Sequence, residues 1–343
     1  MYLLYYINGP PVFSILGLVD FRHSSHVSVV GVTLQDGTGF HLHFLNCSEV
    51  LAEGVRVHAD LRWPNNDGID VTSCNNTVVR GCTVTTGDDA ISPKTWQHYG
   101  PLVNLLIEGC RFTARSGGIH FGASSWYDYV NVTIVDTVVI SAHGGLLAQT
   151  RGPGSIRGLT VRNFLVSRSL FDSPCKPWMG NAQPIAISAD RWCGGPAPCD
   201  KPAGEGKPPG PLAGTITGLR FENITAQGEN GIFISGRAGG VSDATFTRVR
   251  LLLQQRPANN GSFGPCPSRA YWPTSDPPGW YDERDVSVAG VFVEHASGVL
   301  LDDVSVSFLG RPKPGNVWGE CVSVDANSTS GVVSRDVKCT RQD

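Results

Sequence analysis

The sequence predicts an all-β protein, a right-handed parallel β-helix of about ten coils. One observation is an eleven-residue pattern that recurs along the chain, as in SSHVSVVGVTL from residue 24, CSEVLAEGVRV from 47, CNNTVVRGCTV from 74 and LVNLLIEGCRF from 102. The other is composition, because 41 Gly and 23 Pro against only 2 Met favour short strands joined by turns over helices.

Each repeat is expected to form two very short strands joined by a bend, because its apolar residues occupy the fourth, sixth, ninth and eleventh places. A second apolar run adds a third strand after most copies, as in GFHLHFLN from 39, NNDGIDVTS from 65, GDDAISPKT from 87 and SGGIHFGAS from 116. The first six repeats start 23 to 28 residues apart, which is too short for a four-stranded propeller blade of about 40 residues. In a parallel β-helix each coil adds one rung about 4.8 Å from the last, so stacked Val, Ile and Leu fill the interior.

Residues 1–343 are predicted to form a single β-helix domain. Two stretches rich in Pro and Gly, 167–215 and 255–287, break the repeat. Solenoids place such insertions in loops, often on the binding side, so both are expected to wall a groove. The opening MYLLYYINGPPVF reads like the middle of a domain rather than a signal peptide, which leads us to expect that the first coils are missing from this chain.

Charge and cysteine usage narrow the class of partner. The formal net charge is −3 and no run of Lys and Arg occurs, so no nucleic acid is expected. No run reaches the about 18 apolar residues of a membrane span, so we expect no membrane partner. We also expect that the protein needs no cofactor and is a monomer.

The ten cysteines include no pair of CxxC units, so a zinc site is not expected. Cys193 and Cys199 are predicted to close a small disulfide loop, whereas Cys74, Cys82 and Cys110 fall at apolar positions of the repeat and are expected to be buried thiols. Sequons begin at Asn46, Asn75, Asn131, Asn223, Asn260 and Asn327. Together these features favour a secreted or cell-wall glycoprotein.

The most informative stretch runs from residue 64 to 92. Aligning NDGID with DDAIS, one coil later, places Asp67 beside Asp89 and Asn66 beside Asp88. A single Asp at a bend usually caps a turn. Three carboxylates crowded on one outer face are costly, and they supply what glycoside hydrolysis needs: one acid kept protonated and another ionised to activate water.

The segments Asn65-Asn66-Asp67-Gly68-Ile69-Asp70 and Gly87-Asp88-Asp89-Ala90-Ile91 resemble two motifs of the polygalacturonases and related pectin hydrolases of glycoside hydrolase family 28. This resemblance implies a pectin-lyase-like β-helix and inverting hydrolysis of a pectic polysaccharide without a metal. It also implies that Asp88 is the general acid, while Asp67 and Asp89 hold and deprotonate the water.

The chain departs from the family pattern at the residues that contact substrate. Ser116-Gly117-Gly118 stands where the family has Gly-His-Gly, and His120 either points into the cleft or outward to solvent. Leu147-Ala148-Gln149 stands where the family has Arg-Ile-Lys. Arg151 is the nearest cation, and it either compensates for the lost pair or is a solvated loop residue.

Two further positions are candidates for the substrate-binding set. Trp192 corresponds to a family tyrosine and could stack on a sugar ring, or it could belong to the core of a loop. Lys94 could supply a positive edge to the site, with a surface lysine as the ordinary alternative. The expected substrate-binding residues are therefore His120, Gln149, Arg151, Lys94 and Trp192.

Loss of the histidine and of the Arg and Lys pair favours a rhamnogalacturonan-type or side-chain linkage as the alternative to galacturonan. A β-helix lyase would need a base and usually calcium, and would release an unsaturated product that absorbs ultraviolet light. The other alternative is a catalytically silent glycan-binding solenoid. In that case the wild type and Asp88→Asn would bind glycan equally well, and neither would hydrolyse it.

Overall fold

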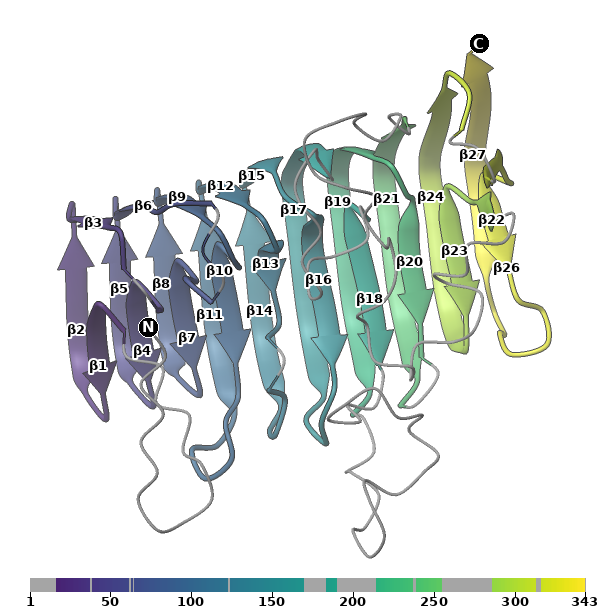
Figure 1. The fold of residues 1–343 in the computed structure, drawn as a ribbon. Helices are drawn as coiled ribbons and strands as arrows, with labels where there is room; N and C mark the ends of the chain where they lie inside the picture. Colours follow the sequence, from purple (N-terminus) through teal and green to yellow (C-terminus); the bar gives the residue numbers. More distant parts are fainter. Residues whose placement is uncertain are drawn as a thin grey trace, which may run out of the picture.

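The computed structural model describes residues 17–169 except 38, 62, 64 and 123, residues 183–189, residues 214–254 except 237 and 238, and residues 286–342 except 313–315. All assigned elements in these ranges are strands, and every strand pair is parallel. The predicted right-handed parallel β-helix is confirmed, with coils stacked in chain order from the purple end to the yellow end in Figure 1.

One sheet contains a strand from each of ten successive coils. In spatial order it consists of β1 (Val19–Arg22), β4 (Leu42–Leu45), β7 (Ile69–Thr72), β10 (Ile91–Lys94), β13 (Gly117–His120), β16 (Gly144–Thr150), β18 (Ile185–Ala189), β20 (Ile232–Ser235), β23 (Val291–Glu294) and β26 (Val322–Val324). Alternate residues of these strands face the interior, because Ile69 pairs with Ile91 and Ile91 pairs with Ile119, and all three are fully buried. The residues between them face the opposite side of the sheet.

The other large sheet contains fifteen strands. Its main row is β2 (Ser25–Val30), β5 (Ser48–Glu53), β8 (Asn75–Arg80), β11 (Leu102–Glu108), β14 (Tyr129–Val135), β17 (Ile156–Ser169), β19 (Ile216–Gly228), β21 (Val241–Leu253), β24 (Ala296–Leu309) and β27 (Val333–Gln342). A second row is β3 (Thr33–Gln35), β6 (Arg56–His58), β9 (Thr83–Thr86), β12 (Arg111–Ala114) and β15 (Val138–Ser141), which ends on β17. A separate pair is formed by β22 (Val286–Val288) and β25 (Asn316–Trp318).

The expected pair of short strands with a bend is confirmed for the early coils, where β8 and β9 are separated by Gly81 at φ 60°. From β17 onward the two strands merge into one strand of 13 or 14 residues in β17, β19, β21 and β24. The bend persists inside these long strands as a left-handed residue, such as Asn163 at φ 51° or Asn223 at φ 55°. An Asn tolerates this conformation without interrupting the ladder on either side.

A row of asparagines stabilises another bend of successive coils. Asn76, Asn104 and Asn131 all have φ between 53° and 57°. The Asn104 side-chain amide donates to Asn76 Oδ1, and the Asn131 amide donates to Asn104 Oδ1, each at 2.8 Å. Each left-handed corner is therefore hydrogen-bonded to the corner of the coil before it.

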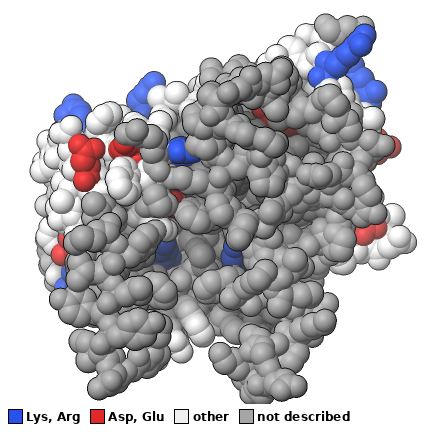
Figure 2. All heavy atoms as spheres, viewed as in Figure 1, with Lys and Arg blue, Asp and Glu red and all other residues white. Residues whose placement is uncertain are grey.

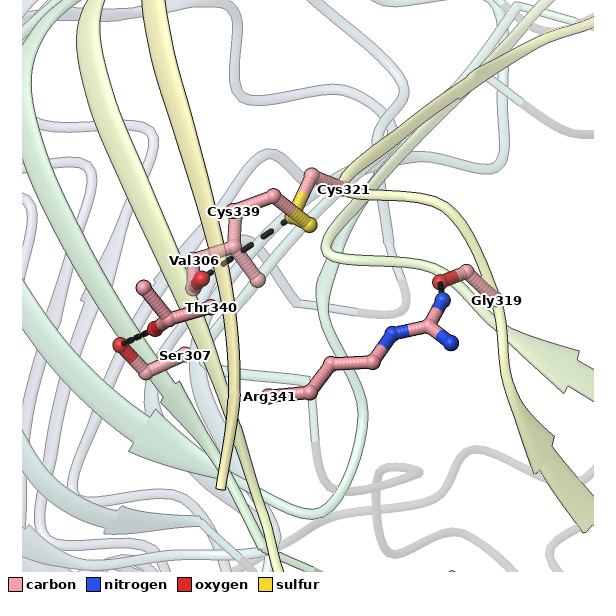
Figure 3. The surroundings of a disulfide bond; sticks show 7 residues. All are labelled: Val306, Ser307, Gly319, Cys321, Cys339, Thr340 and Arg341. Carbon is pink, nitrogen blue, oxygen red and sulfur yellow. Dashed lines mark hydrogen bonds between the residues drawn. A yellow bond between two sulfur atoms is a disulfide. The ribbon is translucent and has the colours of Figure 1, made fainter.

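The cysteines follow two patterns. Cys74, Cys82 and Cys110 are buried free thiols as predicted, and Cys47 joins them. Cys321 and Cys339 form a disulfide with Cα atoms 5.8 Å apart, which ties β27 to the residue before β26 (Figure 3). Arg341 adds a hydrogen bond of 2.9 Å to the Gly319 carbonyl beside it.

Several predictions lie outside the described residues. They are the disulfide loop between Cys193 and Cys199, the stacking role of Trp192, and most of the two insertions. The extent of a single domain over residues 1–343 stays a prediction. In the described ranges no helix is long and apolar enough to cross a membrane. On the face shown in Figure 2, charged side chains of both signs lie in small separate groups.

Candidate active site

Asp67, Asp88 and Asp89 meet immediately before the strands β7 and β10 of the ten-stranded sheet. Asp70 pairs with Ser92 in the ladder, and the Gly68 amide donates to the Asp89 carbonyl at 2.9 Å. The predicted alignment of Asp67 beside Asp89 is therefore confirmed. All three aspartates are buried, with 4% or 5% of their surface exposed.

Asp88 lies in an environment that favours its protonated form. Its Oδ2 accepts one hydrogen bond of 2.8 Å from the Asn65 amide. Burial raises the pKa of Asp88 well above its ordinary value, and the neighbouring charges of Asp67 and Asp89 raise it further. This carboxyl can hold a proton at a pH where an exposed aspartate has lost it.

Asp89 lies beside Asp88 yet has the opposite tendency. Burial is the largest influence and raises its pKa, but the interactions with His120, Lys94 and Ser116 together outweigh burial, and the net pKa is lowered. The Gly117 amide donates to Oδ1 at 2.7 Å, and His120 Nδ1 lies 2.8 Å from Oδ2. Two adjacent carboxyls are thus biased in opposite directions, as a proton donor and a proton acceptor require.

Lys94 is buried, so the expectation of an ordinary surface lysine is wrong. Its side chain lies over the Phe40 ring at 4.5 Å, and its ammonium donates to Asp67 Oδ2 at 2.8 Å and to Asp70 Oδ1. Burial would lower the pKa of Lys94, but the attraction of Asp67, Asp70 and Asp89 together raises it. The ammonium therefore stays charged inside the site.

The same ion pair moderates Asp67. Burial raises the pKa of Asp67, and Lys94 is the main influence that opposes this rise. The net pKa of Asp67 is still raised, but less than burial alone would raise it.

Sequence reasoning missed Asp70, Phe40 and Gly122 as parts of this site. Asp70 occupies an outward position of β7, between the core residues Ile69 and Val71, so strand alternation contained the signal. Gly122 leaves room for the lysine, because a Cβ there would lie 2.6 Å from Lys94 Cγ. No sequence signal linked that glycine to Lys94, since they belong to different coils.

His120 lies within the site rather than outward in solvent, and is 7% exposed. Its imidazole reaches Asp89 from one coil further along the chain. Gly117 permits this position, because a Cβ on Gly117 would lie 2.7 Å from His120 Cβ and 3.1 Å from Asp89 Oδ1. Gly117 thus leaves room for the histidine three positions later.

Gln149 and Arg151 lie further along the ten-stranded sheet, in the coil of β16. Gln149 is buried, and Arg151 donates to Gln149 Oε1 at 2.8 Å. The pair thus consists of one cation bound to a neutral amide. Arg151 is half-buried, so it is neither a fully solvated residue nor a fully buried one.

Aromatic side chains lie beyond the far end of β10. Trp96 packs on His43 with ring centroids 5.4 Å apart, and Tyr99 packs on His23 at 5.7 Å. Trp126 and Tyr127 follow β13 and are 40% and 38% exposed. These rings are chemically suited to stack on sugar faces.

Two other features lie elsewhere in the fold. In the described ranges, Glu294, His295 and Asp325 bring possible metal ligand atoms within 4.8 Å of one another, next to β23. A hollow of about 500 Å³ lies over β17, β19, β21 and β24, and the described residues that line it include Arg250 but no carboxylate. Neither feature includes residues of the aspartate cluster.

Comparison with known proteins agrees with the resemblance seen in the two aspartate motifs. Residues 17–163 match the model of "Glycosyl hydrolases family 28". A probable polygalacturonase of Vitis vinifera is 27% identical over 161 residues, which cover 43% of this chain and 33% of that protein. A probable polygalacturonase of Arabidopsis thaliana is 23% identical over 253 residues, 71% of this chain and 50% of that protein.

A solved structure supports the fold. The family 28 exopolygalacturonase of Yersinia enterocolitica aligns with a TM-score of 0.52 at 17% identity, over 91% of this chain and 44% of that one. The chain thus spans between a third and a half of the length of these three proteins.

Proposed function

We propose that the protein is a secreted, polygalacturonase-type enzyme of glycosyl hydrolase family 28, whose model residues 17–163 match, and that it hydrolyses a pectic polysaccharide with inversion. The observation that carries the proposal is the opposite bias of Asp88 and Asp89, whose pKa values are shifted up and down respectively although the residues are adjacent. A pair of carboxyls in different protonation states is what a single-displacement glycosidase uses.

In this proposal Asp88 donates its proton to the leaving glycosidic oxygen. Asp67 and Asp89 hold the attacking water on the opposite side of the anomeric carbon and remove its proton. Lys94 favours the ionised form of Asp67 through the bond of 2.8 Å between Nζ and Oδ2, against the effect of burial. The carboxylates that deprotonate water are thereby kept distinct from the carboxyl that protonates the leaving group.

The polymer is a pectic polysaccharide, with galacturonan as the default and rhamnogalacturonan as the alternative. A galacturonate carboxylate calls for cations, and at β16 the chain offers one guanidinium that is already bonded to Gln149. Gly117, in place of a histidine, also favours a substrate less uniformly charged than galacturonan. His120, Gln149, Arg151 and Lys94 remain the proposed substrate-binding residues among those described, together with Trp192 outside them.

Reducing-end release from homogalacturonan and from rhamnogalacturonan tests this function, with NMR used to follow the anomer first released. We expect inverted product from one polymer and a loss of at least about 10³-fold in Asp88→Asn. Asp136→Asn is a matched control, because Asp136 is a left-handed bend residue bonded to Asn163 and should keep full activity. A retained anomer, an unsaturated product or an active Asp88→Asn enzyme would each contradict the proposal.

A further inference from the structure

Both oxygens of Asp89 already have hydrogen-bond partners. Oδ1 accepts from the Gly117 amide at 2.7 Å and Oδ2 contacts His120 Nδ1 at 2.8 Å. These two contacts fix the orientation of the carboxylate, and each oxygen keeps a second lone pair. Asp89 is therefore suited to orient the imidazole.

The contact with Asp89 defines the tautomer of His120. An ionised carboxylate only accepts hydrogen bonds, so His120 Nδ1 must carry the hydrogen and the neutral ring has its free lone pair on Nε2. That Nε2 is buried and has no hydrogen-bond partner among the described residues. A buried nitrogen without a partner is costly, so Nε2 is expected to meet a polar group of a ligand or a water.

Gly117 makes this arrangement possible. A side chain at position 117 would meet His120 Cβ at 2.7 Å, Asp89 Oδ1 at 3.1 Å and Leu147 Cδ1 at 3.4 Å. The glycine therefore supplies both an amide for Asp89 and the space in which the imidazole lies.

From this geometry we propose that His120 Nε2 is the atom that accepts the proton of the attacking water, with Asp89 as the positioning residue behind it. The inference rests on the proposed function and reassigns one step of it. As the water oxygen bonds to the anomeric carbon, its proton passes to Nε2 and gives an imidazolium beside the Asp89 carboxylate. The glycosidic carbon–oxygen bond breaks, Asp88 protonates the leaving oxygen, and the imidazolium then loses its proton to solvent while Asp88 regains one.

Chemical rescue separates this role from a structural one. In His120→Ala we expect kcat to fall by about 10² to 10⁴-fold, the usual contribution of a general base. Added imidazole should restore at least about tenfold of that loss, and the restored rate should follow the fraction of imidazole that is unprotonated. His58→Ala, at an exposed position of β6, is the matched histidine control and should keep wild-type activity that imidazole does not change.

Two more variants test the partners. Asp88→Asn should gain nothing from imidazole, because its missing group is the acid. Gly117→Ala should lose activity and shift the acidic limb of the pH profile, because the added methyl group displaces the ring. An active His120→Ala enzyme, or an inactive one with no rescue, would overturn the proposal while leaving the hydrolase function intact.

Failure of the function itself is distinguishable. If the wild type releases no reducing ends from any pectic polymer, the proposed function fails. Nitrogen-15 NMR of His120 then tests the Asp89 and His120 pair directly. A hydrogen on Nδ1 that is lost or weakened in Asp89→Asn would support the pair, and a hydrogen on Nε2 in the wild type would overturn it.

Discussion

The Lys94 ammonium bridges two buried carboxylates, donating to Asp67 Oδ2 at 2.8 Å and to Asp70 Oδ1 from the same nitrogen. The lysine follows Asp67 by 27 residues and lies one coil further along. A buried ion pair of this kind adds little net stability, but removing one partner leaves uncompensated charge. Its clearest consequence is that the pKa of Asp67 rises less than burial alone would raise it.

Lys94→Met should therefore lower activity by about 100-fold or more and cost about 3 to 5 kcal/mol of stability near neutral pH. Because Lys94 opposes the rise in the pKa of Asp67, its loss should raise that pKa. The acidic limb of the kcat/KM profile should then move to higher pH. Lys94→Arg is the control that keeps the charge, and an unchanged pH profile in Lys94→Met would contradict the assignment.

Asp88→Asn should gain thermal stability at neutral pH although it loses activity. A carboxyl with a raised folded pKa binds its proton more tightly when folded, so its contribution to stability is present at low pH and is lost as pH rises through that pKa. Asn cannot ionise and avoids this loss. We expect Tm to rise by roughly 2 to 4 °C at pH 7, the effect of about 1 kcal/mol, and the gain to vanish in acid. A Tm equal to the wild type at both pH values would contradict the buried, proton-binding environment.

Asn104→Ala should destabilise more than Asn104→Gly. Both remove the hydrogen bonds to Asn76 and Asn131, at about 1 kcal/mol each. Only Ala adds the penalty of a left-handed backbone, about 1 to 2 kcal/mol, because Asn104 has φ 56°. Denaturant unfolding measures the difference, and Asn75→Ala, an exposed neighbour without that backbone conformation, should stay within about 0.5 kcal/mol of the wild type.

Cys321→Ser, Cys339→Ser and the double variant should each lose about 3 kcal/mol, since the disulfide closes a loop of sequence separation 18. The losses should not add, because either single substitution already breaks the same bond. Unfolding of the three variants under oxidising conditions measures this. Additive losses would mean that the two residues do not pair.

The register of the site was predictable because it depends on periodic features. Apolar residues at fixed places in each repeat placed Ile69 over Ile91, and Asp67 then had to lie beside Asp89. Burial of Cys74, Cys82 and Cys110 followed from the same phase. These predictions concern which position a residue occupies on a rung, and hydrophobic patterning determines that.

The parts that were not predictable depend on how far a side chain extends from its rung. Lys94 folds back over Phe40 because Gly122 leaves space in the next coil, and a lysine at the end of a strand gives no local sign of this. His120 reaches Asp89 across coils only because Gly117 has no side chain. Such contacts form because a glycine in the next coil leaves space for the side chain, and a single sequence does not show where that space lies. The merged long strands from β17 onward were not predicted. A left-handed Asn is compatible both with two strands separated by a bend and with one strand that continues through the bend.

The stacked rungs also limit how this site can vary. Backbone ladders set the spacing between coils at about 4.8 Å, so the carboxylates cannot drift apart or together as they could on flexible loops. The chemistry of the site can therefore change only when one side chain is replaced by a longer or shorter one at a fixed position of a coil. Gly117 and His120 show the scale of such a step, because the missing side chain at one position leaves room for the side chain that contacts Asp89 from another.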